Sequence, residues 1–553
     1  MTEKDKRAMM GVSRRSFLAA AGIGALGVAG AGMFGCAPKG ASEESALAAD
    51  EKTPVAADET LDVQVCVLGA GPAGVTAAIE AAEKGAEVLV VDLNGAVTGN
   101  AHSVCACSTD YQHALGNDET PEEFVDYLLH YEDNPIVDKD LTLLVARESS
   151  KSIEWLSAHG VEFSGVATSD PEPFELPRIF VTKYGRDSQK AFVEPLWAAA
   201  QAAGVEFKFE TEATALIQDA SGAVVGVEAV GADGHGVTIN AQSVILATGG
   251  FGGDDELMRR YAPWVPNCGA LVAPGLWTRG NGFAIRAGQK VGAELLSGGG
   301  NLMYKNLEGA NADHAGMALH VGVNGRRFCD ESMGRLDRAV KAADLGLSDI
   351  FIIYDSELPN TLYTGTSSSG GTATTSGTGA ITDALQAAID AGTVFKADAI
   401  EALSRQMGIK ATTLADTIET YNGWCRSGVD EEFGKPKEKV GLVLDPNRVD
   451  PNGTEQIEKT FSLLNEIKTP PFYATKCFIS SYQLPATFGG LRINAKAEVI
   501  DTDGNPIPNL YSGGEASNAA ALGRVDVIAG MQMMNCFCFG RIAGDSAAAN
   551  TKS

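Results

Sequence analysis

The sequence lacks the short cysteine motifs that mark several common classes of redox and metal protein. It contains ten cysteines in 553 residues but no Cys-x-x-Cys and no Cys-x-x-Cys-His. The first absence excludes a thioredoxin-type motif and a compact zinc site, and the second excludes attachment of a c-type haem. The cysteines are also spread through a long chain, which argues against the disulfide framework of a small secreted domain.

Basic residues are scarce as well. The chain has 43 Lys and Arg against 71 Asp and Glu, which gives a formal net charge of −28. Nucleic acid binding needs a basic surface, so nucleic acid is excluded as a partner. Two interpretations of the acidity stay open, a solvated surface and a surface that attracts a basic redox partner. Hydrophobic residues at 44% and charged residues at 21% are ordinary for a globular protein of two or three domains.

The N-terminal segment has the pattern of a targeting signal. Ser13-Arg-Arg-Ser-Phe-Leu18 is followed by an Ala- and Gly-rich stretch to Gly35, which is too short and too weakly apolar to span a membrane. The adjacent Arg14 and Arg15 indicate the twin-arginine route, which exports folded proteins and suits one that acquires its cofactor in the cytoplasm. The protein is therefore expected outside the cytoplasmic membrane.

The end of this segment leaves two alternatives open. Met33-Phe-Gly-Cys36 resembles a lipoprotein box, so lipid attachment at Cys36 and plain cleavage are both compatible with it. We predict a signal peptide over residues 1–36. Residues 37–60 are rich in Ala, Glu, Ser, Asp and Thr, and they are predicted to form a flexible tether.

A dinucleotide-binding unit follows. Along the chain it comprises a β-rich run at 63–68, the motif Gly69-Ala-Gly-Pro-Ala-Gly74, an Ala-rich helix at 75–84, a second strand at 87–91, and Asp92. In such a unit Gly69 permits the tight turn, Gly71 admits the pyrophosphate and Gly74 lets the helix approach the strand. The helix N-terminus stabilises the phosphates, and Asp92 accepts the ribose hydroxyls. The unit predicts a Rossmann-type α/β domain but does not distinguish FAD from NAD.

Further segments narrow the choice of cofactor. They are Ile245-Leu-Ala-Thr-Gly-Gly-Phe-Gly-Gly253, Thr278-Arg-Gly-Asn-Gly282, Ile507-Pro-Asn-Leu-Tyr-Ser-Gly-Gly-Glu515 and Phe539-Gly-Arg-Ile-Ala-Gly544. With Gly325-Arg-Arg-Phe328, Pro470-Pro-Phe-Tyr-Ala474 and Gly489-Gly-Leu-Arg-Ile493, the sequence resembles the fumarate reductase-like flavoproteins. That family includes soluble fumarate and urocanate reductases, 3-ketosteroid dehydrogenases and the cardiac glycoside reductase of gut bacteria. The resemblance runs from about residue 61 to residue 548.

The resemblance implies a fold class and a domain order. The expected architecture is an α/β flavoprotein of the glutathione-reductase type, with two dinucleotide-binding domains and an inserted α+β capping domain. The FAD-binding domain would comprise residues 61–301 and 486–553, and the capping domain residues 302–485, with ligands bound between them. Within the cap, residues 363–380 are rich in Ser, Thr and Gly and are predicted to form a loop.

The resemblance also implies FAD as the cofactor, held without a covalent link. His102 lies near the position at which some membrane-bound relatives attach FAD, but its flanking residues differ, so a polar contact is favoured. In such folds the last Gly-Glu lies along the flavin, and the final helix points its N-terminus at an isoalloxazine carbonyl. The expected contacts are Gly69, Gly71, Pro72, Ala73, Gly74, Asp92, Asn100, His102, Ala213, Thr248, Gly249, Gly250, Asn281, Gly514, Glu515, Gly530, Gln532 and Met533.

For catalysis, the resemblance implies hydride transfer from flavin N5 to an alkene and protonation of the neighbouring carbon by an arginine. That arginine stands seven residues after the Phe of the Gly-x-Arg-Phe segment, which here gives Arg335. A guanidinium can act as an acid only if a relay recharges it, and the nearby candidates are Asp330, Glu331 and Asp337. The alternative is that Arg335 belongs to a surface ion pair.

The sequence departs from the dicarboxylate reductases of the family at the substrate site. Tyr304 and Pro485-Ala486 stand where those enzymes carry histidines, and their His-Gly-x-Asn-Arg clamp is missing before Phe539. Arg524 could supply one lost cation, but a clamp for two carboxylates needs several. Tyr304 and Tyr482 suit a larger, less charged substrate with a C=C bond conjugated to a carbonyl, unless both pack in the core.

Two Cys-x-Cys pairs, Cys105-Ala-Cys107 and Cys536-Phe-Cys538, are expected near the flavin edge. With Cys329 and Cys477 they are compatible with a redox or Fe–S site or with buried free thiols. Cys-x-Cys spacing is not a strong cluster signature, which favours thiols.

The predicted function is that of an exported, FAD-dependent reductase of an activated C=C bond that takes part in anaerobic respiration. No NAD(P)H pool exists outside the cytoplasmic membrane and this chain encodes no haem site, so a separate cytochrome or quinol-oxidising donor is implied. Two alternatives remain: a ketosteroid-type dehydrogenase working in the reverse direction, and a flavin electron carrier without catalysis.

Overall fold

The computed structural model describes most of the chain after residue 56. The described residues are 57–99, 103–129, 138–167, 176, 178–185, 187–261, 280–300, 303–306, 316–333, 338, 341–342, 345–347, 349–358, 383–392, 394–444, 456–480, 487–518, 528 and 530–552. The predicted signal peptide 1–36 and the predicted loop 363–380 lie outside them. Within these ranges, no helix combines the length and the apolar character that a membrane span requires.

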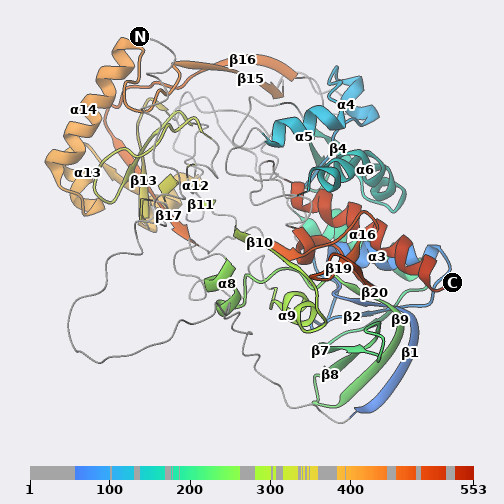
Figure 1. Ribbon diagram of the computed structural model, residues 1–553. Coiled ribbons are helices and arrows are strands. Elements are labelled where there is room, and N and C mark those ends of the chain that lie inside the picture. Colours follow the sequence, from blue (N-terminus) through green and yellow to red (C-terminus); the bar gives the residue numbers. More distant parts are fainter. Residues whose placement is uncertain are drawn as a thin grey trace, which may run out of the picture. The chain divides into compact units, whose positions relative to one another are not determined.

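The largest sheet has the strand order β19-β20-β9-β1-β2-β6, and β8 pairs with both β9 and β7 (Figure 1). Its strands are β1 Ala57–Leu68, β2 Val88–Val91, β6 Glu206–Lys208, β7 Thr211–Gln218, β8 Val224–Gly231, β9 Gly236–Leu246, β19 Glu498–Ile500 and β20 Pro506–Ser512. β1 is parallel to both of its neighbours, β2 and β9. Val65 pairs with Val88 of β2 on one side and with Ser243 of β9 on the other. Parallel strands are covered on both faces, and Val65–Leu68 is accordingly an unbroken apolar run that is at most 1% exposed.

The start of β1 corrects the predicted tether. Residues 37–60 were expected to be flexible, but the strand already begins at Ala57, where Ala57 pairs with Gly236 and Thr60 with Thr238. Composition alone suggested a linker. The backbone pairing offered by the long strand β9 extends β1 into polar sequence, because ladder hydrogen bonds do not depend on side-chain polarity.

The C-terminal part of the chain completes the same sheet. β20 is parallel to β9, with Leu510 opposite Val244 and Ser512 opposite Leu246. The chain thus returns to the domain it began, as the sequence predicts, and the Rossmann-type α/β fold class is confirmed.

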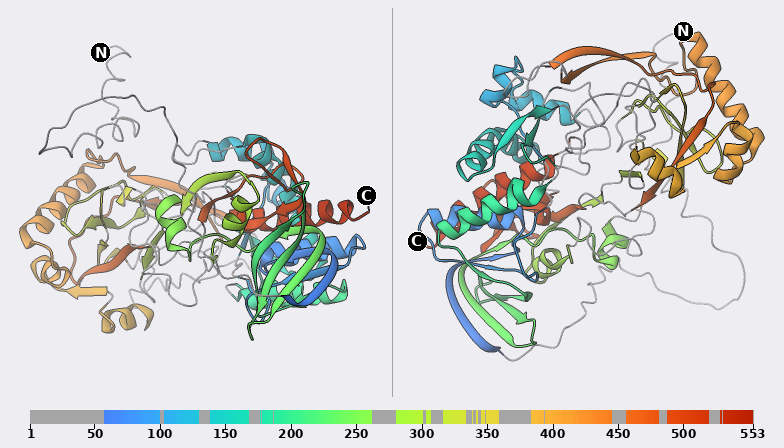
Figure 2. Two further views of the ribbon diagram at one scale, coloured as in Figure 1. Left: turned by 60° about the horizontal axis from the view of Figure 1, so that its bottom comes forward. Right: turned by 180° about the vertical axis from the view of Figure 1, so that it is seen from behind.

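Two helices far apart in sequence lie side by side next to this sheet (Figures 1 and 2). They are α3 Pro72–Glu83 and α16 Met531–Asn550. Gly540 and Gly544 of α16 face α3, and a Cβ on Gly544 would overlap the carbonyl oxygen of Ala77. A Cβ on Gly540 would stand 2.8 Å from the carbonyl oxygen of Ala73, so both glycines are needed for the close approach.

The remaining elements of this part surround the sheet. A small sheet has the order β3-β5-β4. The elements are β3 Ser103–Cys105, α4 Asp110–Ala114, α5 Pro121–Leu129, α6 Lys139–Ala158, β4 Phe163–Ala167, β5 Ile179–Thr182, a π-helical turn Gln189–Val193, α7 Glu194–Ala202, α8 Asp255–Tyr261, α9 Phe283–Lys290 and a 3₁₀ turn Gly514–Ser517.

The region predicted to be the cap contains its own antiparallel sheet, in the order β11-β17-β13-β12, with β14 also on β17. Helices α13 and α14 pack on this sheet through a second core that includes Leu319, Phe351, Leu403 and Ile418. The elements are β11 Met303–Asn306, β12 Leu319–Gly322, β13 Asp349–Asp355, α12 Asp383–Asp390, β14 Val394–Ala397, α13 Ile400–Met407, α14 Ala411–Ser427, β15 Glu438–Leu444, β16 Gln456–Ser462 and β17 Phe472–Ser480.

A two-stranded ladder lies where the chain passes between the two predicted domains. β10 Leu295–Gly300 pairs antiparallel with β18 Thr487–Leu491, and Gly300 stands opposite Thr487. The segment that leaves the FAD-binding residues and the segment that returns to them are therefore hydrogen-bonded to each other. The boundaries 61–301, 302–485 and 486–553 themselves stay a prediction.

Candidate active site

The glycine motif forms the turn that joins β1 to α3, and each of its three glycines has a different role in that turn. Gly69 has a φ of 104°, and a Cβ there would overlap the carbonyl oxygen of Ala247. A Cβ on Gly74 would overlap the carbonyl oxygen of Gly69, so this glycine sets the distance between helix and strand. Gly71 differs from both, because a Cβ there would meet nothing within 4 Å. The space in front of Gly71 is left open for a ligand, as the motif predicts.

The N-terminus of α3 points into this open space. Pro72 and Ala73 are the first two residues of the helix, Gly71 is its N-cap, and no side chain caps it. The first turn contains no acidic residue that would repel a phosphate. Uncapped amides and the positive end of the helix dipole are suited to a pyrophosphate.

Asp92 closes β2 beside the glycine turn. Its Oδ2 accepts a hydrogen bond of 2.6 Å from the Ala70 amide, and its Oδ1 accepts from the backbone and side-chain amides of Asn94 at 2.7 and 2.9 Å. The carboxylate thus fixes the glycine turn to the end of β2. Its role toward the ribose stays a prediction, since three donors already occupy it.

The start of β7 lies next to the end of β2. The Thr211 amide donates to the carbonyl oxygen of Asp92 and the Glu210 amide to that of Asn94, both at 3.0 Å. Ala213 follows two residues along β7. This pairing brings Ala213 to the same end of the sheet as Asp92, which is compatible with its predicted contact to the nucleotide.

Glu515 links three segments that are distant in sequence. Its Oε1 accepts from the amide and the hydroxyl of Thr487 at 2.6 and 2.8 Å, while the Thr487 hydroxyl accepts from the Phe251 amide at 3.1 Å. Gly250 lies against this pair, and a Cβ there would overlap the Thr487 hydroxyl. Burial raises the pKa of Glu515, although the Thr487 donors oppose the shift.

Thr248, Gly249 and Asn281 stand around the same turn. The Thr248 hydroxyl is buried and has no hydrogen-bond partner among the described residues, so it can bind a ligand. Gly249 has a φ of 77°, the left-handed region that glycine adopts without strain. Asn281 is exposed, and its Oδ1 accepts from the Phe283 amide at 3.1 Å at the start of α9.

The start of α16 adds further donors. Gly530 is its N-cap with a φ of 87°, and the Gly530 carbonyl accepts from the Cys105 amide at 3.1 Å. As in α3, no side chain caps the helix and no acid stands in its first turn. Gln532 follows, and its Nε2 is buried without a partner among the described residues. Met533 is partly buried against the core. Gly514 has a φ of 71° and packs against Ala73.

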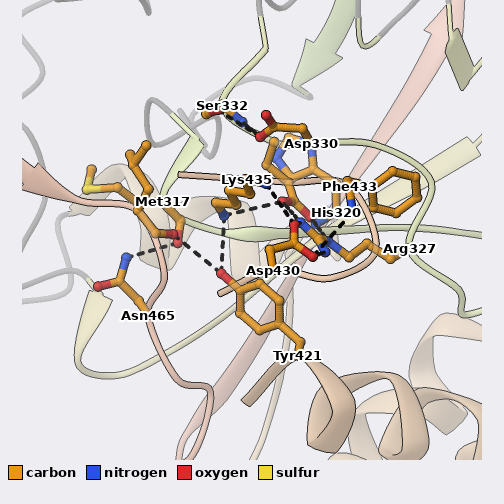
Figure 3. Close-up of polar contacts among 12 residues, drawn as sticks. Met317, His320, Arg327, Asp330, Ser332, Tyr421, Asp430, Phe433, Lys435 and Asn465 are labelled. Carbon is orange, nitrogen blue, oxygen red and sulfur yellow. Dashed lines mark hydrogen bonds and ion pairs between the residues drawn. The ribbon is translucent and has the colours of Figure 1, made fainter. Parts of the chain in front are cut away.

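In the cap, four charged side chains form a buried cluster that the sequence analysis did not predict as a unit (Figure 3). Arg327 donates to both oxygens of Glu331, at 2.7 Å each, and to both oxygens of Asp430, at 2.8 and 2.7 Å. Lys435 lies 3.3 Å from Glu331 and donates to the Tyr421 hydroxyl at 3.1 Å. Each of the four charged side chains is at most 1% exposed.

Local structure explains how the cluster forms. Gly325, with a φ of 74°, turns the chain after β12, so that Arg327 pairs beside Val321. Glu331 follows four residues later, and the loop after α14 supplies Asp430 and Lys435. Two cations and two anions cancel, which is the condition under which buried charges are tolerated.

The charge state of Glu331 corrects one prediction. Burial opposes ionisation, but Lys435 and Arg327 outweigh it and hold the pKa of Glu331 below its ordinary value. Both carboxylate oxygens are also occupied by Arg327. The folded cap therefore favours the anion of Glu331, and the pairing with Arg327 argues against the relay role that its position in the sequence suggested. Asp330, which accepts from the amide and hydroxyl of Ser332, and Asp337, which lies outside the described residues, keep the relay role as a prediction.

Comparison with known proteins agrees with this geometry. Residues 64–527 match the family described as FAD binding domain. The chain belongs to this family. It is 27% identical over 516 residues to the urocanate reductase of Eggerthella lenta, covering 89% of this chain and 75% of that protein. It is 28% identical over 487 residues to the vinyl phenol reductase of Lactiplantibacillus plantarum, covering 83% and 90%.

A solved structure supports the fold. The open conformation of a flavocytochrome c3 fumarate reductase has a TM-score of 0.64 with this chain, at 24% identity, covering 90% of this chain and 80% of that one. The predicted resemblance to the fumarate reductase-like flavoproteins, the cofactor FAD and the class of oxidoreductase are thereby confirmed. The open space at Gly71, the uncapped helices and the unmatched donors of Thr248 and Gln532 fit that cofactor.

The structure leaves several predicted residues undecided. Arg335, Arg524 and Tyr482, and the predicted FAD contacts Asn100 and His102, lie outside the described residues. Tyr304 is described by its backbone only, on β11, where it pairs with Ile479. Their roles stay predictions.

Three residues of the FAD region were not predicted from the sequence. Thr487, Asn518 and Asn535 are fully buried polar side chains that hydrogen-bond to predicted FAD contacts. The only signal in the sequence was polar residues next to otherwise apolar or small ones, at the ends of β18, the Gly-Glu segment and the last helix. Such a pattern does not distinguish a ligand site from an ordinary surface position.

Seven cysteines are free thiols, namely Cys66, Cys105, Cys107, Cys329, Cys425, Cys536 and Cys538. Burial raises the pKa of Cys107, Cys536 and Cys538 to about 12 in each case, so these side chains stay protonated. Cys538 lies 3.3 Å from the Ser152 hydroxyl, and Cys107 3.4 Å from the Ala146 carbonyl oxygen. These are packing contacts of neutral thiols, which fits the interpretation of the two Cys-x-Cys pairs as buried free thiols.

Proposed function

We propose that this protein reduces an activated C=C bond of a small organic molecule. FAD, when bound, supplies the hydride. The relatives named above are a urocanate reductase and a vinyl phenol reductase, and both names describe reductions of unsaturated molecules. The chain contributes the binding site for the cofactor, and its cap contributes the proton donor.

Arg335 is the proposed proton donor, and the assignment rests on its position seven residues after Phe328 of the Gly-x-Arg-Phe segment. Arg338, which is 1% exposed, donates from Nη1 to the carbonyl oxygen of Glu331 at 3.1 Å. The Glu331 side chain is held in turn by Arg327. Glu331 and Arg338, which flank Arg335 in the sequence, are thus both buried and hydrogen-bonded to each other.

A general acid has to stay in line with a substrate carbon, since a misplacement of about 1 Å can cost about 100-fold in rate. We infer that the cluster positions Arg335, whereas Arg335 itself transfers the proton.

The substrate is proposed to be larger and less charged than a dicarboxylate. The histidines and the His-Gly-x-Asn-Arg clamp are missing from the sequence, and Tyr304 stands in β11 at one of the replaced positions. Tyr304, Tyr482 and Arg524 are the proposed substrate contacts. A phenol can donate to a carbonyl oxygen and stack on a ring.

The proposed setting is outside the cytoplasmic membrane, reached by the twin-arginine route, with electrons from a separate haem protein or quinol-oxidising donor. The basis is the Arg14-Arg15 segment and the lack of a haem motif. Reduced viologen dyes are then expected to support turnover, and NADH is not.

The test is anaerobic stopped-flow on the FAD-loaded protein, reduced with dithionite. It is mixed with enoates, urocanate, cinnamates, and unsaturated steroids or lactones. With the substrate found, Arg335→Gln should lower the rate of flavin reoxidation by about 100-fold or more, the usual contribution of a general acid. Arg426→Gln is the matched control, because Arg426 is an exposed cap arginine, paired with Glu419 and Glu466.

Each alternative predicts a different result. If no compound reoxidises the flavin while a saturated ketone bleaches the oxidised form, the enzyme is a dehydrogenase. If no compound reoxidises or reduces the flavin while the FAD content is normal, the result supports an electron carrier. Full turnover of Arg335→Gln removes the assignment of Arg335.

A further inference from the structure

Three carboxamides, of which two are fully buried and one is partly buried, form a hydrogen-bonded chain at the start of α16. Asn535 Nδ2 donates to Asn518 Oδ1 at 2.7 Å, and Asn518 Nδ2 donates to Gln532 Oε1. Asn518 and Asn535 are both 0% exposed. We call Asn535, Asn518 and Gln532 the amide chain.

Two backbone carbonyls fix the direction of the amide chain. Asn535 Nδ2 also lies 3.3 Å from the Gly514 carbonyl oxygen, and Asn518 Nδ2 lies 3.3 Å from that of Thr487. A carbonyl oxygen only accepts, so each asparagine must turn its nitrogen toward the backbone. Amide orientation is usually ambiguous, but here the network determines it.

The orientation of Asn518 determines that of the Gln532 side-chain amide. Because Asn518 presents its nitrogen to Gln532, the glutamine must present its oxygen in return. Its Nε2 is then one free end of the amide chain, and Asn535 Oδ1 is the other; both atoms are buried with no hydrogen-bond partner among the described residues. A buried N–H without an acceptor costs about 1–3 kcal/mol, so the site is built for a ligand that supplies one.

The surroundings indicate which ligand. Gln532 is the second residue of α16, whose N-terminus is uncapped, and Gly514 and Thr487 belong to the segments joined by Glu515. These are the elements that carry the predicted FAD contacts. No cation of the described residues hydrogen-bonds to the amide chain, so it offers donors without a formal charge.

We propose that Gln532 Nε2 donates to a carbonyl oxygen of the isoalloxazine, and that Asn518 and Asn535 are positioning residues for that donor. The acceptor edge of a flavin gains negative charge on reduction. A fixed donor therefore stabilises reduced FAD more than oxidised FAD and makes the bound cofactor easier to reduce. This inference rests on FAD binding and not on the proposed substrate reaction.

The experiment measures FAD in both redox states on the full chain. Apoprotein is titrated with FAD by fluorescence, and the midpoint potential of the bound cofactor is measured with reference dyes. Gln532→Met keeps the length of the side chain and removes the donor. We expect the affinity for reduced FAD to fall about tenfold more than that for oxidised FAD, which for two electrons is about 30 mV toward negative potential.

Two further variants keep the test decisive. Gln532→Glu retains an acceptor for Asn518 and replaces the donor by an anionic oxygen, so it should shift the potential in the same direction and further, even if Gln532→Met folds poorly. Gln289→Met is the matched control, because this glutamine of α9 donates to the Tyr261 hydroxyl at 3.4 Å instead. Its potential should equal that of the wild type.

Three outcomes would overturn the proposal. The first is an unchanged ratio of the two FAD affinities in Gln532→Met and Gln532→Glu. The second is an equal shift in Gln289→Met, which would show a general effect of the fold. The third is a change confined to the KM of an organic substrate, which would place the donor on the substrate and not on the flavin.

Discussion

Buried polar side chains are treated differently in two regions of this protein. Around the start of α16 they are uncharged amides, and the amide chain ends in a donor that no described residue satisfies. In the cap, Arg327, Glu331, Asp430 and Lys435 are charged, and each has its partners inside the cluster.

The difference reflects two roles. A site that receives a ligand must keep hydrogen-bonding groups open, and neutral donors can remain open at a lower cost than bare charges. A structural cluster is stable only if every buried charge has a partner, because one missing partner leaves a charge uncompensated. The FAD region is therefore expected to respond to substitution through the cofactor, and the cap through stability.

The largest effect should come from breaking the cap cluster. Arg327→Met leaves Glu331 and Asp430 without their shared cation and should lower the free energy of unfolding by about 3–5 kcal/mol. Denaturant unfolding of the apoprotein measures it. Arg426→Met, in an exposed pair with Glu419 and Glu466, should cost about 1 kcal/mol or less. Equal losses in the two variants would contradict the distinction between a closed cluster and surface pairs.

A glycine pair sharpens the comparison within the FAD region. In Gly74→Ala the new methyl group overlaps the Gly69 carbonyl oxygen, so unfolding free energy should fall by about 1–3 kcal/mol and FAD binding with it. In Gly71→Ala the methyl group enters open space at a φ of −80°, so the apoprotein should keep its stability within about 0.5 kcal/mol.

The same Gly71→Ala variant should nevertheless lose FAD affinity, because its methyl group occupies the space of the ligand. Thermal unfolding of apoprotein and FAD titration separate the two quantities. Stability loss in Gly71→Ala, or unchanged FAD affinity, would show that the space in front of this residue is not the phosphate site.

Two glutamates should give pH dependences of opposite sign. The pKa of Glu331 is lowered from 4.5, and that of Asp430 from 3.8 to about 2, so their stabilisation is complete above pH 4.5 and is lost as pH falls toward 2. The pKa of Glu515 is raised from 4.5, so its protonated form favours folding, and stability falls as pH rises above 4.5.

Single variants separate the two contributions to the pH dependence of the unfolding free energy. Glu331→Gln should flatten the loss of unfolding free energy below pH 4.5, and Glu515→Gln should remove a decline above it in the apoprotein. Equilibrium unfolding from pH 3 to pH 7 provides the measurement. A Glu515→Gln profile parallel to that of the wild type would show that Glu515 is ionised in the folded protein.

The smallest effect is expected from the thiols. Cys107 and Cys538, with pKa values of about 12, should resist iodoacetamide at pH 8 in the native protein and react only after unfolding. Cys538→Ser should change the unfolding free energy by about 1 kcal/mol or less, since Ser152 and the Val145 carbonyl oxygen can bond the hydroxyl. Mass spectrometry counts the modified thiols, and rapid native labelling would indicate a reactive site.

Much of the FAD region was predictable because its signals are local. The spacing of Gly69, Gly71 and Gly74 predicts three distinct backbone environments, and the structure confirms them. The β-rich run 63–68 predicts a strand, and β1 contains it. Where local composition was the only guide, as for residues 57–60, the prediction was wrong, because strand pairing with β9 is a property of two distant segments.

By itself, the sequence determined the Rossmann-type nucleotide unit, since backbone conformation, helix dipole and glycine spacing act over a few residues. The family and the cofactor followed from a resemblance that runs over nearly the whole chain after residue 61. Only the tertiary structure decided which polar groups are satisfied. Glu331 turned from a relay candidate into a paired anion because Arg327 and Lys435 meet it across more than one segment. Gln532 became a directed donor because the carbonyls of Gly514 and Thr487 orient the amides between them. Hydrogen-bond satisfaction depends on distance in space, which spacing along the chain does not encode.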